Sequence, residues 1–459
     1  MGPRIAIIGG GSAHWTPRLL LDFVNTPPLA ESEVVLMDTS SASLPAVQAV
    51  ADHIAELGVG GLDVTTTTDL DAALTGARFV VTAYSVGGFE AMTHDLAIPE
   101  AHGLPQPVGD SVGPGGIARA LRSIPVTLGI ARAMERNCPD ALLLNVSNPL
   151  TALCRAVTKE TRIATVGLCN ELVGLTWAMS LLFDVAMHEV DPVVGGVNHC
   201  PLVTAMTIGG SDGFAMIRAL LERPVAELDD PIWMDPPEGS HWAKVSGGEK
   251  WTKGDVVHNN RLKFELLARF GVMPGASDTH VAEFFPWFVT EESGFGEAWG
   301  VHHYGIEGHR ADKDADEAEL ASLRVATELP PWPSGELVAP ILGAIVSDQE
   351  KHFPVNLPNT GQVSTLDDGP VVECMGVVHA AGVAPRDRVE VASVLGECLR
   401  RTVSSQELTV EAALRGDRTL VLEAMLSDQM TCRLPYESIV AITDELLAAT
   451  APWLPQFAG

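Results

Sequence analysis

GDSVGPGGIARALRSIP, residues 109–125, is the stretch around which the rest of the chain is organised. Five of its first eight residues are glycine or proline, a density that interrupts helix and strand and leaves backbone amides free to face a ligand. After Gly116, apolar residues recur at helical spacing from Ile117 to Ile124. We therefore predict that the glycine-rich loop leads directly into the N-terminus of a helix. Such a terminus is a favourable binding position for anionic or hydroxyl-bearing groups.

Length and composition predict a globular protein of two domains or one large domain. The chain has 459 residues, 46 % of them hydrophobic, and no apolar run approaches the roughly 18 residues of a membrane span. Its seven cysteines are odd in number and widely spread, which favours a reducing cytoplasm over a disulfide framework. A net charge of −30 argues against nucleic acid and anionic membranes as partners, and the start lacks the pattern of a secretory leader.

The N-terminus has the order of a dinucleotide-binding unit. A predicted strand at 5–8 leads into the turn Gly9-Gly10-Gly11-Ser12, then a helix, then a second strand that ends at Asp38. In such units the glycine turn receives the pyrophosphate and the acid binds the ribose hydroxyls, so Gly9, Gly11, Ser12 and Asp38 are candidate cofactor residues. An acid at 38 favours NAD over NADP. The match to GxGxxG lacks its third glycine, and an ordinary strand–turn–helix connection is the alternative.

Further alternation predicts a doubly wound, Rossmann-type parallel sheet. Strands are expected at 64–68, 79–83, 141–144 and 163–168. Polar or glycine turns follow three of them, at 86–88, 145–149 and 169–170, and the carboxyl ends of parallel strands line one ligand crevice. Gly87 and Asn145 are therefore further candidate cofactor residues.

The composition changes near Asp191, where a second domain is expected to begin. We predict a nucleotide-binding domain at 1–195 and an α+β domain for substrate binding and oligomerisation at 196–459. Residues 261–270 read as a helix and 311–322 as a charged, solvated segment. The chain from 340 to 452 reads as helices around one β-like segment at 371–378.

Nine motifs in order give the chain a resemblance to glycoside hydrolase family 4, the NAD-dependent glycosidases. They are GGGS (9–12), LMD (36–38), VGG (86–88), the glycine-rich stretch above, NVSNP (145–149), GLCN (167–170), GVNH (196–199), HVAEFFPWF (280–288) and VNLPNTGQVSTL (355–366). The resemblance implies a lactate and malate dehydrogenase-like fold, a homodimer or homotetramer, NAD, and a divalent metal, commonly manganese. It also implies glycoside cleavage by transient oxidation at sugar carbon 3, elimination, water addition and re-reduction, unlike two-carboxylate glycosidases.

The same resemblance suggests site residues. Cys169 and His199 match the family's metal ligands, and a thiolate with an imidazole suits a borderline divalent ion. Asn148 matches a position that binds sugar hydroxyls. Asn170 and Asp110 are placed to act through water as the acid or to orient the aglycone.

The base that removes the carbon-2 proton is not identified by the resemblance. Many members use a tyrosine in the segment after the metal histidine, whereas Tyr84, Tyr304 and Tyr436 all lie outside it. Lys253, Asp255 and His258 are the alternatives, each needing a suitable pKa.

The substrate is expected to be unphosphorylated. Members that cleave 6-phosphosugars carry an arginine shortly after VGG, where this chain has Met92-Thr93-His94. We expect a sulfoquinovoside first, then a glucuronide or galactoside, with His94, Arg261, His280 and Lys253 as candidate cationic contacts.

Two other functions are alternatives to a glycosidase. One is an NAD-dependent dehydrogenase of a sugar or hydroxy acid with net hydride transfer. The other is a non-catalytic nucleotide sensor, which Cys169 and His199 disfavour.

Overall fold

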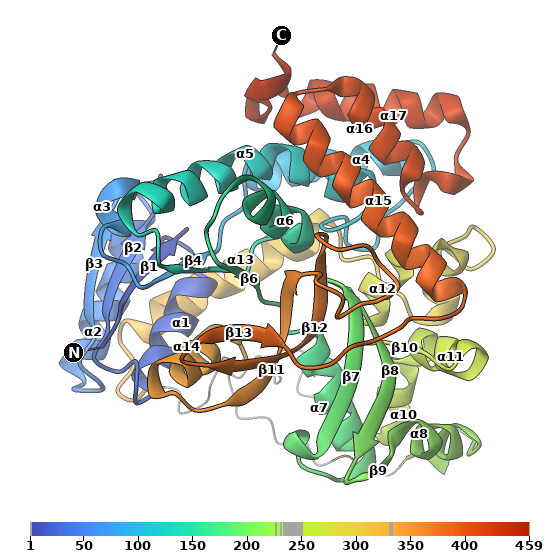
Figure 1. The fold of residues 1–459 in the computed structure, drawn as a ribbon, viewed down its shortest axis with the longest axis horizontal. Coiled ribbons are helices and arrows are strands. Elements are labelled where there is room, and N and C mark those ends of the chain that lie inside the picture. The colour runs from blue at the N-terminus through green and yellow to red at the C-terminus, as the bar shows by residue number, and fades with distance from the viewer. Residues whose placement is uncertain (1, 225–226, 230–231, 233–250, 330–333, 459) are drawn as a thin grey trace.

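The computed structural model describes residues 2–224, 227–229, 232, 251–329 and 334–458 (Figure 1). Across these residues, one mixed sheet of 13 strands runs through the molecule. Its order is β10-β8-β7-β12-β11-β6-β5-β4-β1-β2-β3, with β13 beside β12 and β9 beside β8. The sheet therefore joins the N-terminal and C-terminal halves of the chain.

The first six strands form the parallel half of the sheet. They are β1 (Arg4–Ile8), β2 (Glu33–Met37), β3 (Asp63–Thr67), β4 (Phe79–Thr82), β5 (Leu142–Asn145) and β6 (Thr165–Gly167). They pair in the order β3-β2-β1-β4-β5-β6, and every pairing is parallel. This order reverses direction between β1 and β4, where ligands of such sheets bind beyond the carboxyl ends. The predicted fold class is confirmed.

Helices cover both faces of this half because successive strand residues point to opposite sides. Ile5 and Ile7 pack in a core with α1, α2 and α14, whereas Ala6 and Ile8 pack in another with α3, α5 and α6. These helices are α1 (Trp15–Val24), α2 (Leu44–Glu56), α3 (Leu70–Leu74), α5 (Gly113–Asn137), α6 (Leu150–Glu160) and α14 (Val338–Ser347).

The antiparallel half begins where β11 (Lys351–Pro358) pairs with β6 and, along its whole length, with β12 (Val371–His379). β12 pairs in turn with β7 (Val190–Val197), which forms a hairpin with β8 (Cys200–Ile208). Short strands complete it: β9 (Ser211–Asp212), β10 (Met273–Pro274) and β13 (Gly382–Pro385). The tip of the β7–β8 hairpin carries His199, which this topology brings toward the end of β6.

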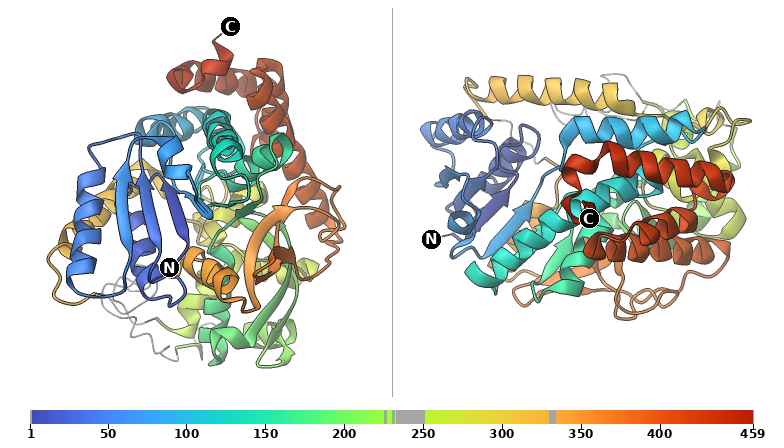
Figure 2. Two further views of the ribbon diagram at one scale, coloured as in Figure 1. Left: turned by 60° about the vertical axis from the view of Figure 1, so that its left-hand side comes forward. Right: turned by 90° about the horizontal axis from the view of Figure 1, so that it is seen from above.

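The C-terminal helices α15, α16 and α17 pack against α5 and α6 through a separate apolar core. In Figure 1, α16 and α17 lie above α5 and α15 runs down beside α6, and in the right view of Figure 2, seen from above, these helices lie in front of α5. The remaining helices are α4 (Gly88–Ala101), α7 (Glu171–Phe183), α8 (Gly213–Leu221), α10 (Lys253–His258), α11 (Arg261–Phe270), α12 (Asp278–Phe284), α13 (Gly305–Leu323), α15 (Val394–Arg415), α16 (Arg418–Ser427) and α17 (Tyr436–Ala449).

The glycine-rich stretch becomes helical earlier than predicted, because α5 begins at Gly113 rather than after Gly116. Gly115 and Gly116 lie in its first turn, pressed against the preceding loop. A Cβ at Gly115 would lie 2.8 Å from the Gly109 carbonyl oxygen, and one at Gly116 would lie 2.5 Å from the Ser111 carbonyl carbon. The glycines therefore permit a close approach of loop and helix, and they do not delay the helix.

The predictions for the second half of the chain have different outcomes. The segment 340–452 contains β11 and β13 as well as the predicted strand at 371–378, and the prolines at 354 and 358 hide β11 from a strand pattern. The charged segment 311–322 belongs to α13 and is mostly exposed, as predicted, although Asp316 is buried and pairs with Arg18 at 3.0 Å. The expected domain boundary at 195/196 falls inside β7, and the division into two domains stays a prediction.

Candidate active site

Turns that follow the carboxyl ends of five strands lie at one edge of the parallel sheet. They follow β1, β2, β4, β5 and β6, and they comprise residues 9–12, 38, 86–88, 148–149 and 169–170. Every turn that the sequence singled out therefore lies at the same edge of the sheet, where the ligand crevice of such folds is found.

The turn after β1 has the geometry that a dinucleotide needs. Gly9 has a φ of +93°, and a Cβ there would lie 2.1 Å from the carbonyl oxygen of Ala83. The amide of Gly11 donates to Oδ2 of Asp38 at 3.1 Å, and Oγ of Ser12 accepts from an amide of α1 at 3.1 Å. A turn whose glycines lack side chains and pack against the end of β4 has room for a pyrophosphate, and an acid at the end of β2 can bind a ribose.

Gly87 and Asn145 shape the floor of the crevice. Gly87 precedes α4 with a φ of +78°, a conformation that favours glycine. Asn145 is 1 % exposed, accepts from Oγ1 of Thr82 at 2.8 Å and donates to the Ser147 carbonyl at 2.9 Å. The side chain of Asn145 is therefore used in hydrogen bonds within the protein, which suits a residue that stabilises the loop around a cofactor site.

An acid and two histidines form a compact cluster at the end of this crevice. One ligand atom from each of Asp110, His199 and His280 lies within 4.8 Å of the others. Oγ of Ser111 donates to Asp110 at 2.8 Å and lies 2.9 Å from Nδ1 of His199. The amide of Asn148 donates to Oδ2 of Asp110 at 2.9 Å. The predicted residues Asp110, Asn148, His199 and His280 thus meet in space.

Four separate elements bring this cluster together. Asp110 lies in the glycine-rich loop, His280 in α12, and His199 in the β7–β8 turn with a φ of +66°. Cys169 follows β6 and interacts with His199 by charge and by hydrogen bonding. The imidazoles of His199 and His280 are stacked, with ring centroids 3.8 Å apart.

The pKa values of the cluster reflect burial and opposite charges. Burial alone would raise the pKa of Asp110, but His199, His280 and Arg119 hold it well below its usual range. Burial likewise opposes charge on His199, yet Cys169 and Asp110 raise its pKa well above the ordinary value. The pKa of the Cys169 thiol is raised by burial, an effect that His199 partly offsets. A carboxylate, imidazoles and a thiol at such close quarters form a donor set that fits a borderline divalent ion.

A cavity of about 590 Å³ opens beside the cluster. Three of the predicted residues line it: Asp110, Asn170 and His280. The sequence missed other residues of its wall: Glu171, Trp177, Trp251, Lys263, Tyr304 and His309. The wall of the cavity therefore combines ionisable side chains with two tryptophans.

Five residues proposed from sequence do not line this cavity: His94, Lys253, Asp255, His258 and Arg261. The Lys253 ammonium lies 3.5 Å from Asp184, and Asp255 caps its own helix through Thr252. Val256 is the residue of α10 that lines the cavity, and Lys253, Asp255 and His258 are not among the lining residues. The guanidinium of Arg261 lies over Trp299 and donates to the Ala298 carbonyl. The structure therefore supports none of these five as a group in contact with substrate.

Lys263 and Glu171, two polar cavity residues that were not identified from the sequence, are held in place by the N-terminus of α12. Lys263 is 3 % exposed, and its ammonium lies 3.2 Å from Asp278. Glu171 accepts from the Ser277 amide at 2.6 Å and lies 3.9 Å from His280. A local signal existed for Glu171, which directly follows Cys169-Asn170, but no pattern distinguished Lys263 from other helix lysines.

Glu283 holds the glycine-rich loop from beneath. It is 1 % exposed, and its Oε1 accepts from the amides of Val108 and Gly109 at 2.9 Å each. Burial raises its pKa from 4.5 to about 8, against those two hydrogen bonds. Glu283 is therefore a neutral support for the loop that carries Asp110.

This pKa predicts a pH-dependent stability. Between pH 4.5 and 8 the folded protein binds one more proton at Glu283 than the unfolded chain, so stability falls as the pH rises. Glu283→Gln keeps the acceptor and cannot lose a proton. The free energy of unfolding of the metal-free protein is measured with denaturant between pH 6 and pH 8. For each pH unit, the difference in this free energy between Glu283→Gln and the wild type is expected to shift by up to about 1.4 kcal/mol in favour of the variant. Parallel pH profiles would contradict this, and Glu283→Ala should be destabilised throughout.

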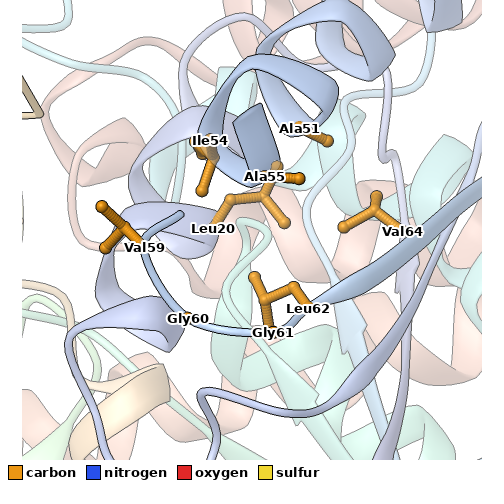
Figure 3. Close-up of a pocket in the computed structure, with 9 residues that line it drawn as sticks. All are labelled: Leu20, Ala51, Ile54, Ala55, Val59, Gly60, Gly61, Leu62 and Val64. Atoms are coloured by element: carbon orange, nitrogen blue, oxygen red, sulfur yellow. The ribbon is translucent and has the colours of Figure 1, made fainter. Parts of the chain in front are cut away.

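A second cavity, of about 60 Å³, lies between α2 and the start of β3 (Figure 3). Its nine lining residues are aliphatic or glycine, so it offers no group for catalysis or for metal binding.

Among the described residues, no helix is both long and apolar enough to span a membrane.

Comparisons with known proteins agree over nearly the whole chain. The model for the family 4 glycosyl hydrolases matches residues 4–185, and the model for their C-terminal domain matches residues 194–431. The chain is 27 % identical over 460 residues to the alpha-galactosidase of Bacillus subtilis (strain 168), covering 99 % of each. The crystal structure of Bacillus subtilis lplD is similar, with a TM-score of 0.83 and 25 % identity over 97 % of this chain and 100 % of that one.

A further solved structure, that of the 6-phospho-beta glucosidase from Thermotoga maritima, contains manganese, NAD+ and glucose-6-phosphate. It has a TM-score of 0.76 and 20 % identity to this chain, over 98 % of this chain and 99 % of that one. At that identity the likeness is one of fold.

Proposed function

Because the chain belongs to the family 4 glycosyl hydrolases, we propose that it is an NAD-dependent glycosidase that requires a divalent metal ion. The observation that carries the proposal is the meeting of Asp110, His199 and His280 beside Cys169, at the carboxyl edge of a nucleotide-type sheet. A dehydrogenase with net hydride transfer would share the sheet, but the family match does not favour it.

The residues present fit both cofactors. The turn at Gly9, Gly11 and Ser12, with Asp38, would hold NAD, while Cys169 and His199 would hold the ion with help from the cluster's other donors. Bound NAD supplies a reversible hydride acceptor for sugar carbon 3, and a bound divalent ion supplies Lewis acidity toward sugar oxygens. The solved relative with manganese and NAD+ supports both assignments.

The chain's own groups orient the sugar and the water. Asp110 is ionised and accepts a hydrogen bond from Asn148, so the pair can hold a sugar hydroxyl or a water between them. Asn170 lies on the cavity wall, and its side-chain amide, which donates to Glu336 at 3.3 Å, is our candidate contact for the aglycone. Tyr304 lines the same wall, with its hydroxyl donating to Asp312, and it is the described tyrosine that the cavity offers for removal of the carbon-2 proton.

We propose a small glycoside with a polar or anionic carbon-6 group as the substrate, with a sulfoquinovoside first, then a glucuronide or galactoside. Lys263 is the cationic candidate on the cavity wall and replaces His94, Lys253 and Arg261 in this role, while His280, whose pKa is lowered by burial, offers an imidazole beside it. The alpha-galactosidase relative supports inclusion of the galactoside. A homodimer or homotetramer is proposed for the assembly, which light scattering would test.

A panel of nitrophenyl glycosides tests the function. The protein, with manganese and a trace of NAD, is expected to release nitrophenol from at least one of these sugars without net formation of NADH. Chelation of the metal or removal of NAD should each stop the release. Accumulating NADH would instead identify a dehydrogenase, and NAD binding without turnover would identify a non-catalytic sensor.

A further inference from the structure

The cavity extends well beyond the metal-type cluster, along one face of α7. The residues of α7 at 171, 174, 175 and 178 all line it, and their spacing places them on a single helical face. From Glu171 to Ala178 the helix rises about 10 Å at 1.5 Å per residue. The wall therefore continues past the sugar position that lies beside Asp110 and His280.

The far part of this wall is apolar and aromatic. Trp177 and Trp251 lie with ring centroids 6.4 Å apart and planes tilted by 57°. Leu175, Ala178 and Val256 fill the wall around them and are themselves buried. Flat apolar surfaces of this kind favour rings, because aromatic groups gain both area burial and specific ring contacts.

Gly174 keeps this space open. It lies inside α7, where glycine costs stability relative to alanine, and no neighbour explains it. Among the residues that the structure describes, a Cβ built on Gly174 meets nothing within 4 Å, and the backbone of Gly174 is not in the left-handed region. The missing side chain leaves room in the cavity, one helical turn from Glu171.

We propose that this part of the cavity is an aglycone subsite for an aromatic or similarly flat apolar ring, kept open by Gly174 and walled by Trp177 and Trp251. The assignment rests on the proposed glycosidase function, and it adds the chemical class of the leaving group. The natural substrate is then a glycoside of an aromatic alcohol, with the sugar at the cluster and the ring along α7.

Benzyl and methyl glycosides of the same sugar test the subsite, because both release a primary alcohol and differ mainly in the ring. The sugar is the one that the wild type hydrolyses fastest. The wild type should show a kcat/KM for the benzyl glycoside at least roughly tenfold above that for the methyl glycoside. Gly174→Leu, which fills the space, should lower this ratio at least tenfold, and Trp251→Ala should lower it in the same direction.

The matched control is Gly129→Leu, since Gly129 is also a helical glycine with nothing within 4 Å but lies on the surface of α5. It should leave both rates unchanged. A wild-type ratio near one, or equal losses on both glycosides in Gly174→Leu, would overturn the subsite.

A failure of the proposed glycosidase function can be distinguished from a failure of the proposed subsite. If the wild type hydrolyses no glycoside, saturation-transfer NMR with benzyl alcohol decides the subsite alone. Transfer in the wild type and in Gly129→Leu, but not in Gly174→Leu, supports it. Equal transfer in all three, or none in the wild type, overturns it.

Discussion

Replacing His199 by alanine is expected to abolish tight metal binding and to lower kcat/KM roughly 1,000-fold, equivalent to about 4 kcal/mol of transition-state stabilisation. His199 is 3 % exposed, and it lies within reach of Asp110, Cys169 and His280. No other described residue at the tip of the β7–β8 hairpin supplies an imidazole there. Manganese binding is measured by electron paramagnetic resonance, and hydrolysis on the best glycoside of the panel.

Cys169→Ser is the companion variant, expected to weaken metal binding and turnover together because a serine hydroxyl is a poorer ligand than a thiolate. His352→Ala, an exposed histidine on β11, and Cys138→Ser, a thiol of another core, are the controls and should keep both properties. If His199→Ala retained wild-type affinity for manganese, the metal would have to bind elsewhere.

Gly9→Ala is expected to destabilise the protein by roughly 3 kcal/mol or more and to weaken NAD binding roughly 100-fold. The added Cβ would lie 2.1 Å from the Ala83 carbonyl oxygen, and the φ of +93° is strained for alanine. The turn must therefore move away from β4, which displaces the amides that face the pyrophosphate.

Gly129→Ala is the matched control for this variant. It adds the same methyl group to a helix, where nothing lies within 4 Å, and should stabilise the protein by about 0.5 to 1 kcal/mol. Denaturant unfolding and calorimetric titration with NAD measure the two effects. Unchanged NAD affinity in a folded Gly9→Ala protein would remove the β1 turn from the cofactor site.

The parallel half of the fold was predictable because its signals are local. Each buried strand between 4 and 167 ends in a glycine or polar turn, and those strands appear in the structure close to their predicted bounds. The same locality made Asp38, Asp110 and Cys169 recognisable, since each directly follows a strand or lies within a glycine-rich loop.

The rest of the site depends on contacts between distant segments. Trp177 and Lys263 reach the cavity only because α7 and α11 meet there, and no pattern within either helix marks them. Glu283 belongs to the motif HVAEFFPWF, but its contact with the glycine-rich loop depends on how α12 packs. The candidate bases on α10 lie off the cavity wall for a related reason. Val256 lines the cavity, whereas Lys253, one turn earlier in the same short helix, lies 3.5 Å from Asp184, and the packing of distant segments decides which of them reaches the cavity.

Exchange of the carbon-2 proton tests the central claim most directly. Hydrolysis in deuterated water, with manganese and a trace of NAD, should give a free sugar that carries deuterium at carbon 2, seen by NMR as loss of that proton's signal. The NADH concentration should not rise. A product that keeps its carbon-2 proton throughout would mean that the glycosidic bond breaks by direct displacement and that the NAD-dependent elimination proposed for this chain is wrong.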